Sequence, residues 1–389
     1  MLIVPTTEGW ERQYAGRLQI VRLEVMEREG AQAREQFGVQ WVPAFVLLDA
    51  AGAVRCGRRA CPRRRRICGP SAFDASALAA PPMSILLFFV DGIGLGEDDE
   101  RTNPFSRAHL PTLHRISGGR RWLKGQGPWQ SEWARMWATD ARMGVPGRPQ
   151  SASSQAALLS GGNVPAYLGE HYGPRPDARI RQLLRRRNLF LRFASCGMRV
   201  ATWEAYPPSF YQALDRGRRL PASLQYAALV AGLQLRNAED LRRGEALPGD
   251  FTGAAWRQHF DAEFPTLTRK EAGMRLARLA RDYDFSMFSY WWTDVVGHRG
   301  DLAQAVAQLE LLDDVLAGLL AEWNREEDTL ILTSDHGNLE AMDHGKHTEN
   351  EIPTLVYGAG RDAFREPISL QDIAPAIEKI AGIAEVSSG

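Results

Sequence analysis

The stretch Ser84-Ile-Leu-Leu-Phe-Phe-Val-Asp91-Gly92 decides the fold, because six consecutive apolar residues, 85–90, are followed by an aspartate and a glycine. A continuous apolar run of this length that ends in turn-forming residues is typical of a parallel strand covered on both faces. The run is far shorter than the ~20 apolar residues of a membrane span. It therefore predicts a buried strand of a mostly parallel sheet, and this strand ends at Asp91.

Strands and helices alternate on either side of this stretch. Further strands are expected at 198–206, 284–292, 328–335 and 352–358, and helices at 176–195, 301–323 and 370–382. In the longest helix the apolar residues recur at spacings of three and four, and Asp301 is a suitable N-cap. The fold class predicted for residues 83–389 is α/β, with a mostly parallel sheet sandwiched by helices.

Residues 1–57 are predicted to form a smaller α/β segment. A strand at 17–25, a helix ending at Gly38 and a hairpin turn at Ala51-Gly52 follow one another in this segment. This order resembles the second half of a thioredoxin-like domain, and Pro43 stands where that family has its cis-proline. The C-x-x-C motif of that family is absent from the segment, so no thiol chemistry is expected.

Residues 58–82 are rich in arginine, proline and alanine and show no periodicity, so we expect a disordered linker. The apolar strand begins just after Met83, which looks like the start of an independent protein. One hypothesis is that the linker is an accidental join between two neighbouring reading frames, and the sequence leaves open whether residues 1–82 belong to the functional protein. Expression of residues 83–389 alone tests this expectation, since an insoluble or inactive product would contradict it.

Charge and cysteine content exclude several classes of protein. Lys+Arg and Asp+Glu are both 47, and lysine occurs only at positions 124, 270, 346 and 379. With no net charge, a basic field for nucleic acid is not indicated. Three of the four cysteines lie together in 56–68, which is no disulfide framework. With no secretory leader or apolar span, we expect a cytoplasmic protein without nucleic-acid or membrane partners.

The ends of the expected strands carry metal-ligand residue types. Asp91 ends the first strand, Thr293-Asp294 and His298 follow the strand at 284–292, Ser334-Asp335-His336 follows the strand at 328–335, and His347 precedes the last strand. Function gathers at the carboxyl ends of strands in open α/β sheets, and Asp with neutral imidazole suits Zn²⁺ or Mn²⁺. Each residue alone is more simply a turn former or helix cap, but their joint occurrence favours a metal site.

A serine supplies a candidate nucleophile. Residues 144–163 contain a Gly/Pro-rich approach, a short helical run that begins at Ser151, and Gly161-Gly162. The N-terminus of a helix favours an anion such as phosphate, and a serine beside a divalent metal can act as a nucleophile. The alternative is that Ser151 only caps the helix, and the residues alone do not separate these two hypotheses.

The ordered set D-G, Ser151, T-D-x-x-G-H, S-D-H-G-N and H-T-x-N-x-x-P resembles the alkaline phosphatase superfamily, in particular the branch of cofactor-independent phosphoglycerate mutase and phosphopentomutase. The resemblance covers residues 83–389 and implies two divalent metal ions, Mn²⁺ or Zn²⁺. It also implies two sets of ligands. One metal would be held by Asp294, His298 and His347, and the other by Asp91, Asp335, His336 and Ser151. Ser153 and Ser154 are neighbouring alternatives to Ser151.

The implied chemistry is phosphoryl transfer to Ser151 from a small phosphorylated substrate. Residues 207–268 form a short insertion, expected as a small lid, which favours hydrolysis of a phosphomonoester over a mutase reaction. A phosphomutase is the second hypothesis, and a non-catalytic metal-binding scaffold is the third. Substrate-binding candidates are Arg148, Arg299, Lys346 and His344. The oligomeric state, the choice between Mn²⁺ and Zn²⁺ and the identity of the substrate stay open.

Overall fold

The computed structural model describes residues 46–48, 54–57, 83–364 and 368–383. The chain divides into two compact units, Met1–Ala79 and Ala80–Gly389. In the first unit, β1 (Val46–Leu48) and β2 (Val54–Gly57) pair antiparallel on either side of the expected turn. The strand at 17–25, the helix ending at Gly38 and the linker at 58–82 lie outside the described residues, so these expectations stay predictions.

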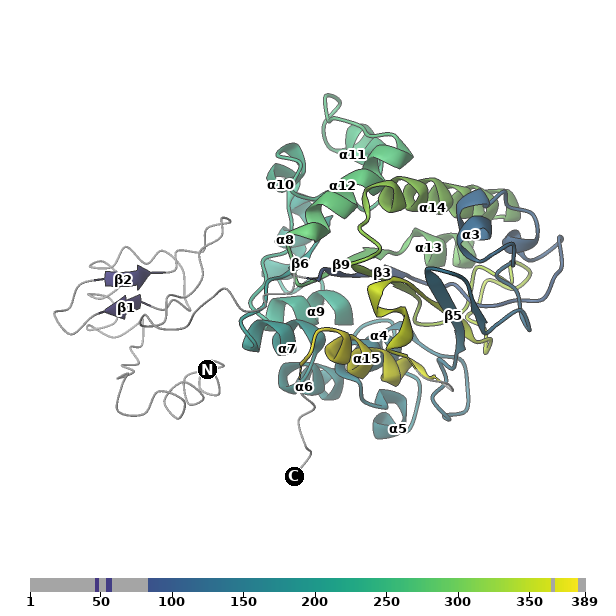
Figure 1. Ribbon diagram of the computed structural model, residues 1–389, viewed down its shortest axis with the longest axis horizontal. Helices are drawn as coiled ribbons and strands as arrows, with labels where there is room; N and C mark the ends of the chain where they lie inside the picture. The colour runs from purple at the N-terminus through teal and green to yellow at the C-terminus, as the bar shows by residue number, and fades with distance from the viewer. Residues whose placement is uncertain (1–45, 49–53, 58–82, 365–367, 384–389) are drawn as a thin grey trace. The chain divides into compact units, whose positions relative to one another are not determined.

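The second unit is built on a seven-stranded sheet with the order β4-β5-β11-β10-β3-β9-β6 (Figure 1). The four strands from β10 to β6 run parallel to one another, whereas β11, β5 and β4 each pair antiparallel. The strands are β3 (Ile85–Val90), β4 (Trp129–Gln130), β5 (Ala134–Thr139), β6 (Val200–Thr202), β9 (Phe285–Tyr290), β10 (Thr329–Thr333) and β11 (Ile352–Gly358). The predicted α/β class with a mostly parallel, helix-covered sheet is confirmed.

Strand β3 lies in the middle of this sheet because both of its faces are apolar. All six of its residues are fully buried. Successive side chains point to opposite faces of a strand, so Leu86 and Phe88 pack in one hydrophobic core while Ile85 and Leu87 pack in the other. The apolar run thus serves two helical layers at once, which accounts for its continuous pattern.

Helices cover both faces of the sheet (Figure 1). One layer contains α12 (Arg269–Arg281), α13 (Trp292–Arg299) and α14 (Leu302–Glu322), together with η1 (Pro104–Ser106) and α3 (Pro111–Ile116). The other contains α4 (Ser151–Ser160), α5 (Val164–Leu168), α6 (Ala178–Arg186), α7 (Leu189–Ser195), α9 (Ser223–Val230) and α15 (Ile373–Ile380). Short 3-10 turns η2 (Ala359–Asp362) and η3 (Leu370–Asp372) complete the C-terminal part. As predicted, Asp301 caps α14, where its side chain accepts a hydrogen bond from Gln304 N.

Some expected elements divide in two, and some strands were missed. The helix expected at 176–195 breaks into α6 and α7 because Asn188 caps the second part by accepting from Leu191 N. The strand expected at 198–206 becomes β6 and β7 (Glu204–Ala205), and β7 pairs with β8 (Leu247–Pro248) outside the main sheet. Strands β4 and β5 have no counterpart in the sequence-based prediction, because their residues follow no clear period.

The segment 207–268 contains α8 (Pro208–Asp215), α9, α10 (Ala238–Arg242), β8 and α11 (Ala254–His259). Its first half packs in the core beneath the sheet, where Leu224 and Ala227 of α9 are buried and Ser223 Oγ donates to Ala152 O over 2.8 Å. Its second half forms a smaller cluster around Trp256 and Phe264. The α9 part therefore packs beside α4, and the expectation that 207–268 forms a lid stays a prediction.

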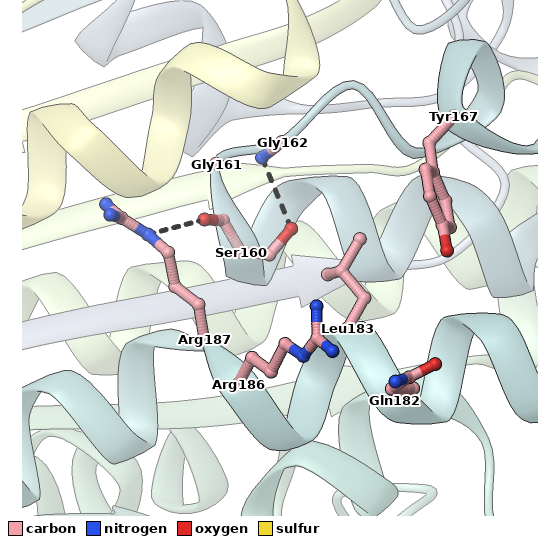
Figure 2. A pocket seen from close by; sticks show the side chains of 8 residues that line it. All are labelled: Ser160, Gly161, Gly162, Tyr167, Gln182, Leu183, Arg186 and Arg187. Atoms are coloured by element: carbon pink, nitrogen blue, oxygen red, sulfur yellow. Dashed lines mark hydrogen bonds between the residues drawn. The ribbon is translucent and has the colours of Figure 1, made fainter. Parts of the chain in front are cut away.

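Two further features concern membrane-spanning helices and a surface pocket. Within the described ranges, no helix combines the length and the apolar character needed to cross a membrane. A surface pocket of about 370 Å³ lies at the C-terminal end of α4, lined by residues that include Ser160, Tyr167, Arg186 and Arg187 (Figure 2). Arg187 Nε donates to Ser160 O over 2.9 Å there. This pocket is at the opposite end of α4 from Ser151, so it is separate from the site described below.

Glu204 in β7 makes stability depend on pH. Its side chain is buried, and burial raises its pKa from 4.5 to about 7 in spite of hydrogen bonds from Ser289. The folded protein then holds this proton more tightly than the unfolded chain, so the free energy of unfolding falls as pH rises from about 4.5 to about 7. We expect Glu204→Gln to remove this loss and to be more stable than the wild type at pH 8, by at most about 3 kcal/mol.

Urea unfolding of both proteins at pH 5 and pH 8 measures this effect. At pH 5 the two proteins should differ little, because the native carboxyl is already protonated. An equal stability difference at both pH values would contradict the assignment of the raised pKa to Glu204.

Candidate metal centre and nucleophile

The carboxyl ends of three adjacent parallel strands bring the expected ligands together. Asp91 follows β3, Asp294 lies in the first turn of α13 just after β9, and Asp335 and His336 follow β10. Strands β10, β3 and β9 are neighbours in this order and run in the same direction. His347 comes from the loop before β11, and its backbone neighbour Thr348 bridges to Gly337. The residues separated by up to 256 positions in the chain therefore share one edge of the sheet.

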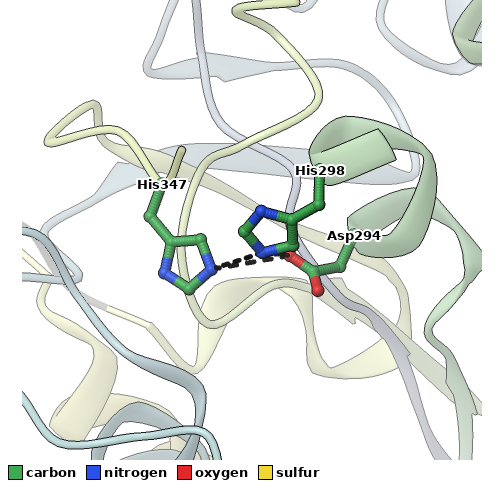
Figure 3. A group of neighbouring side chains, drawn as sticks. All are labelled: Asp294, His298 and His347. Carbon is green, nitrogen blue, oxygen red and sulfur yellow. Dashed lines mark hydrogen bonds and ion pairs between the residues drawn. The ribbon is translucent and has the colours of Figure 1, made fainter. Parts of the chain in front are cut away.

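The first group of ligands is Asp294, His298 and His347, whose side chains converge in Figure 3. His298 Nε2 lies 3.3 Å from Asp294 Oδ1, and His347 Nε2 lies 3.6 Å from the same oxygen. The two Nε2 atoms are 3.1 Å apart. This is the set of three that the sequence analysis predicted for one metal ion.

Backbone carbonyls orient both histidines of this group. Gly345 O lies 2.8 Å from His298 Nδ1, and Pro149 O lies 2.8 Å from His347 Nδ1. A carbonyl oxygen only accepts, so each Nδ1 carries a proton, and in the neutral tautomer with this proton the lone pair of Nε2 points inward. Two lone pairs cannot hydrogen-bond to each other. The arrangement fits a cation between the Nε2 atoms, and carbonyl-oriented imidazoles of this kind are usual around bound metals.

The second group is Asp91, Asp294 and His336, so the carboxylate of Asp294 belongs to both groups. His336 Nε2 lies 3.4 Å from Asp91 Oδ1 and 3.6 Å from Asp335 Oδ2. The rings of His336 and His347 stack with their centroids 3.6 Å apart, which joins the groups into one centre. The sequence analysis had assigned Asp294 to one metal only, and the sharing of its carboxylate is a feature that the structure adds.

The charge at this edge of the sheet is strongly negative and lacks a balancing cation among the described contacts. Burial raises the pKa of Asp91 well above its usual value, and the carboxylates of Asp335 and Asp294 raise it further. Asp91 Oδ1 and Asp335 Oδ1 are buried with no hydrogen-bond donor in the described structure. Burial also acts to raise the pKa of Asp294, but the neighbouring histidines outweigh it and lower this pKa to about 2. Clustered carboxylate oxygens without hydrogen-bond donors are suitable ligands for divalent cations.

Ser151 is the first residue of α4, and its hydroxyl points to the metal-ligand residues. Ser151 Oγ lies 3.0 Å from His336 Nε2. Gln150, not Ser151, occupies the N-cap position, and Gly161 ends the helix in a left-handed conformation. The hypothesis that Ser151 is only a helix cap is therefore wrong. Of the alternatives, Ser153 Oγ donates to Gln150 O, and Ser154 is fully buried.

Three polar residues that the sequence analysis missed support the ligands. Gln155 Nε2 donates to Asp335 Oδ2 over 3.0 Å, and it lies 3.5 Å from Asp91 Oδ2. Asn338 Nδ2 donates to Asp294 Oδ1 over 2.8 Å. Gln155 lies one helical turn after Ser151, which is a signal that the sequence offered. Asn338 was part of the S-D-H-G-N motif but had no assigned role.

The third supporting residue is Glu340, a buried carboxylate that ties together the three loops carrying the ligands. It accepts from Gly94 N over 3.0 Å and from Asn338 N over 2.8 Å. It also accepts from Asn350 Nδ2 over 3.0 Å and from the hydroxyl of Thr348. A Cβ at Gly94 would lie 2.2 Å from Glu340 Oε1, so only glycine allows this close approach.

We expect Glu340→Gln to weaken binding of Mn²⁺ by about 10- to 100-fold, because an amide cannot accept all four of these bonds and the ligand loops lose their alignment. Isothermal titration of the metal-free protein with Mn²⁺ measures this. The matched control is Asp313→Asn. Asp313 is equally buried and accepts from Thr112 N and Leu113 N, but it caps α3 and touches no ligand loop. Equal loss of metal affinity in both variants would mean that Glu340 acts only through global stability.

The four residues expected to bind substrate are all exposed. Arg148 lies next to Pro149, whose carbonyl contacts His347, and Arg299 follows His298. In the loop before His347, His344 Nδ1 accepts from Lys346 N. These residues lie near the ligands in the sequence, but in the described part of the chain no side-chain contact joins them to the ligand groups. Their role in substrate binding stays a prediction.

An α/β sheet that presents two carboxylate–histidine groups and a helix-terminal serine at one edge defines a candidate two-metal centre. Comparison with known families agrees with this class. Residues 264–385, which contain Asp294, His298, Asp335, His336 and His347, match the family model described as the Metalloenzyme superfamily.

Curated proteins are similar to about a third of the chain. The chain is 32% identical over 128 residues to the 2,3-bisphosphoglycerate-independent phosphoglycerate mutase of Moorella thermoacetica, which is 31% of this chain and 25% of that protein. It is 33% identical over 127 residues to the enzyme of the same name from Roseobacter denitrificans, with 31% and 25% coverage. The chain thus spans about a quarter of the length of these relatives.

Matches to solved structures cover more of the chain than the curated relatives do, but at lower sequence identity. The PH0037 protein from Pyrococcus horikoshii has a TM-score of 0.47 at 15% identity, with 80% of this chain and 100% of that chain covered. An alkaline phosphatase from the Antarctic bacterium TAB5 has a TM-score of 0.45 at 12% identity, with 79% and 100% coverage.

Proposed function

We propose that the chain is a binuclear metal-dependent enzyme that hydrolyses a phosphomonoester through a phosphoserine at Ser151. One observation carries this proposal: Ser151 Oγ stands at the N-terminus of α4, 3.0 Å from His336 Nε2, beside a centre in which Asp294 joins two ligand groups. Asp294, His298 and His347 would hold one divalent cation, and Asp91, Asp335 and His336, together with the shared Asp294, the other. Bound there, such ions would neutralise phosphate charge and increase the nucleophilicity of the serine.

The residues of the chain itself would orient the reactants. The N–H groups of the first turn of α4 and the helix dipole favour a phosphate next to Ser151. Ser153 N and Ser154 N are already bonded, to Tyr172 O and Gln150 O. The N–H groups of Ser151 and Ala152 receive no acceptor from the described residues, so they are available for a phosphate oxygen. Burial lowers the pKa of His336, which favours the neutral imidazole that a metal ligand needs.

Transfer of the phosphoryl group to Ser151 Oγ breaks the ester bond and releases the alcohol, and water then cleaves the phosphoserine to give phosphate. Incubation of the protein with Mn²⁺ or Zn²⁺ and para-nitrophenyl phosphate tests the reaction, with mass spectrometry of Ser151 after an acid quench. Release of nitrophenol with phosphate on Ser151 supports the proposal. Two bound metals without turnover and without phosphoserine would favour the metal-binding scaffold instead.

A phosphomutase is the second candidate, and the 30–33% identity of about a third of the chain to phosphoglycerate mutases favours it. In a mutase an acceptor hydroxyl, not water, would take the phosphoryl group from Ser151. Conversion of 3- to 2-phosphoglycerate without release of inorganic phosphate would establish this alternative. A cytoplasmic location also belongs to the proposal, and cell fractionation tests it.

A further inference from the structure

The pocket at the C-terminal end of α4 lies outside the metal centre. Helix α4 has ten residues, with Ser151 at its first position and Ser160 at its last. At 1.5 Å per residue these two positions are ~15 Å apart along the helix axis. The volume of about 370 Å³ falls in the range of ~300–1,000 Å³ that is usual for small-molecule sites. The pocket is therefore a second candidate site, which the chemistry proposed for Ser151 does not use.

Hydrogen bonds and core packing hold the walls of this pocket in place. Arg187 Nε donates to Ser160 O over 2.9 Å, which ties the end of α6 to the end of α4. Leu183 of α6 packs against the hydrophobic core on the α4 side of the sheet and gives the pocket an apolar wall. Asn163 caps α5, and its Nδ2 donates to Met143 O over 2.8 Å. The pocket is thus formed by anchored elements in the absence of any ligand.

Three polar side chains that line the pocket have no hydrogen-bond or ion-pair partner among the described residues: Tyr167, Gln182 and Arg186. Gln182 and Arg186 are four residues apart, so they lie on the same face of α6. Tyr167 is 61% exposed, the largest fraction among the exposed large hydrophobic side chains of the described chain. Figure 2 shows the guanidinium of Arg186 between Ser160 on one side and Tyr167 and Gln182 on the other. The pocket therefore offers a charge, an amide and an aromatic ring, all available to a ligand.

The positive charge beside this pocket is only partly balanced by acids. Residues 178–187 contain five arginines and no aspartate or glutamate. Two of these arginines, Arg179 and Arg187, form ion pairs with acids outside the helix. Arg185 Nη1 donates to a tyrosine hydroxyl, and Arg186 has no partner in the described structure. A guanidinium that lines a pocket without a counter-ion favours an anionic ligand, above all one with two oxygens that match its fork.

We propose that this pocket binds a mononucleotide, with its phosphate at Arg186 and its base on the ring of Tyr167. A mononucleotide carries the three groups that these side chains complement. The fork of Arg186 suits two phosphate oxygens, and an exposed aromatic ring is a stacking platform for any base. The amide of Gln182 has both donors and an acceptor for the edge of the base. The inference does not rest on the proposed function, since no residue that lines the pocket is a candidate metal ligand or nucleophile.

Isothermal titration of the full chain carrying Ser151→Ala tests the proposal, because this background removes any turnover of a nucleotide as a phosphomonoester. The probes are AMP, CMP, adenosine and ribose 5-phosphate. We expect AMP or CMP to bind about tenfold or more tightly than adenosine, which lacks the phosphate, and than ribose 5-phosphate, which lacks the base. Absence of binding by both nucleotides, or equal binding of both nucleotides and ribose 5-phosphate, would overturn the proposal.

Substitutions on α6 and α5 locate the bound nucleotide. Arg186→Gln should weaken binding about tenfold or more, as for loss of a charged hydrogen bond, whereas Arg186→Lys keeps the charge and should retain part of the affinity. Arg185→Gln is the matched control, since Arg185 is the exposed neighbour whose guanidinium is already engaged, and it should bind like the parent protein. Tyr167→Ala should weaken binding and Tyr167→Phe should preserve it. Affinity that is unchanged in both Arg186→Gln and Tyr167→Ala would refute the pocket.

Gly162 offers a way to fill the pocket without changing its charge. A Cβ at Gly162 would make only an ordinary contact of 3.5 Å with Ser160 Oγ, so a side chain is tolerated there. Gly162→Leu should abolish nucleotide binding and Gly162→Ala should keep most of it, while thermal melting checks that both variants are folded. The affinity of the parent protein should be equal with Mn²⁺ and with EDTA. Binding that needs Mn²⁺, or that persists at full strength in Gly162→Leu, would place the nucleotide elsewhere and overturn the proposal.

Discussion

Substitution of Ser151 by alanine is expected to lower kcat for phosphomonoester hydrolysis on the order of 10³-fold or more, as loss of an essential nucleophile does in other enzymes. The physical reason is the position of the Ser151 hydroxyl beside the metal-ligand residues. Ser151 Oγ is the hydroxyl that lies 3.0 Å from His336 Nε2 at the N-terminus of a ten-residue helix. Steady-state assays with para-nitrophenyl phosphate and added Mn²⁺ measure the loss.

The same helix provides the controls. Ser153 and Ser154 are both buried, and neither hydroxyl contacts a ligand residue in the described structure. Ser153→Ala and Ser154→Ala should therefore keep most of the activity. Titration with Mn²⁺ should show that Ser151→Ala still binds much of its metal, since three side chains of each ligand set remain. Full activity of Ser151→Ala, or loss of activity in Ser154→Ala alone, would show that the nucleophile is assigned to the wrong residue.

Substitution of Asp294 by alanine is expected to have the largest effect on metal binding. Its carboxylate belongs to both ligand groups, lying 3.3 Å from His298 Nε2 and 3.6 Å from His347 Nε2. Loss of supporting residues alone lowers metal affinity 10- to 100-fold in other proteins, so loss of a shared ligand should cost on the order of 100-fold or more at both sites.

Metal analysis after equilibrium dialysis against Mn²⁺ measures the number of bound ions per chain. We expect this number to fall below that of the wild type because both sites lose metal. The rise in melting temperature that Mn²⁺ gives to the wild type should also disappear, because a ligand stabilises the fold only by binding it. Asp343→Asn is the control, since Asp343 is an exposed acid in the loop before His347. A variant of Asp294 that loses only one ion would show that the carboxylate is not shared.

The local pattern of the sequence was sufficient for much of the fold. The apolar run at 85–90 predicted β3 to the residue, and the spacing of three and four together with Asp301 predicted α14 to within one residue at each end. Hydrophobic periodicity and helix caps act over a few residues, so they can be read from neighbours in the chain. Strands β4 and β5 escaped prediction because β5 is stabilised by pairing with β11, more than 200 residues away, and β4 pairs in turn with β5.

The candidate site, like the fold, was predictable from the sequence only in part. The sequence by itself determined the residue types: aspartates and histidines at strand ends, and a serine at the start of a helix. Only the tertiary structure decided that Asp294 joins two groups and that Glu340 ties three loops together. Each of these relations joins residues that are distant in the chain. Sheet order and helix packing determine such distances, and no local pattern of residues contains them.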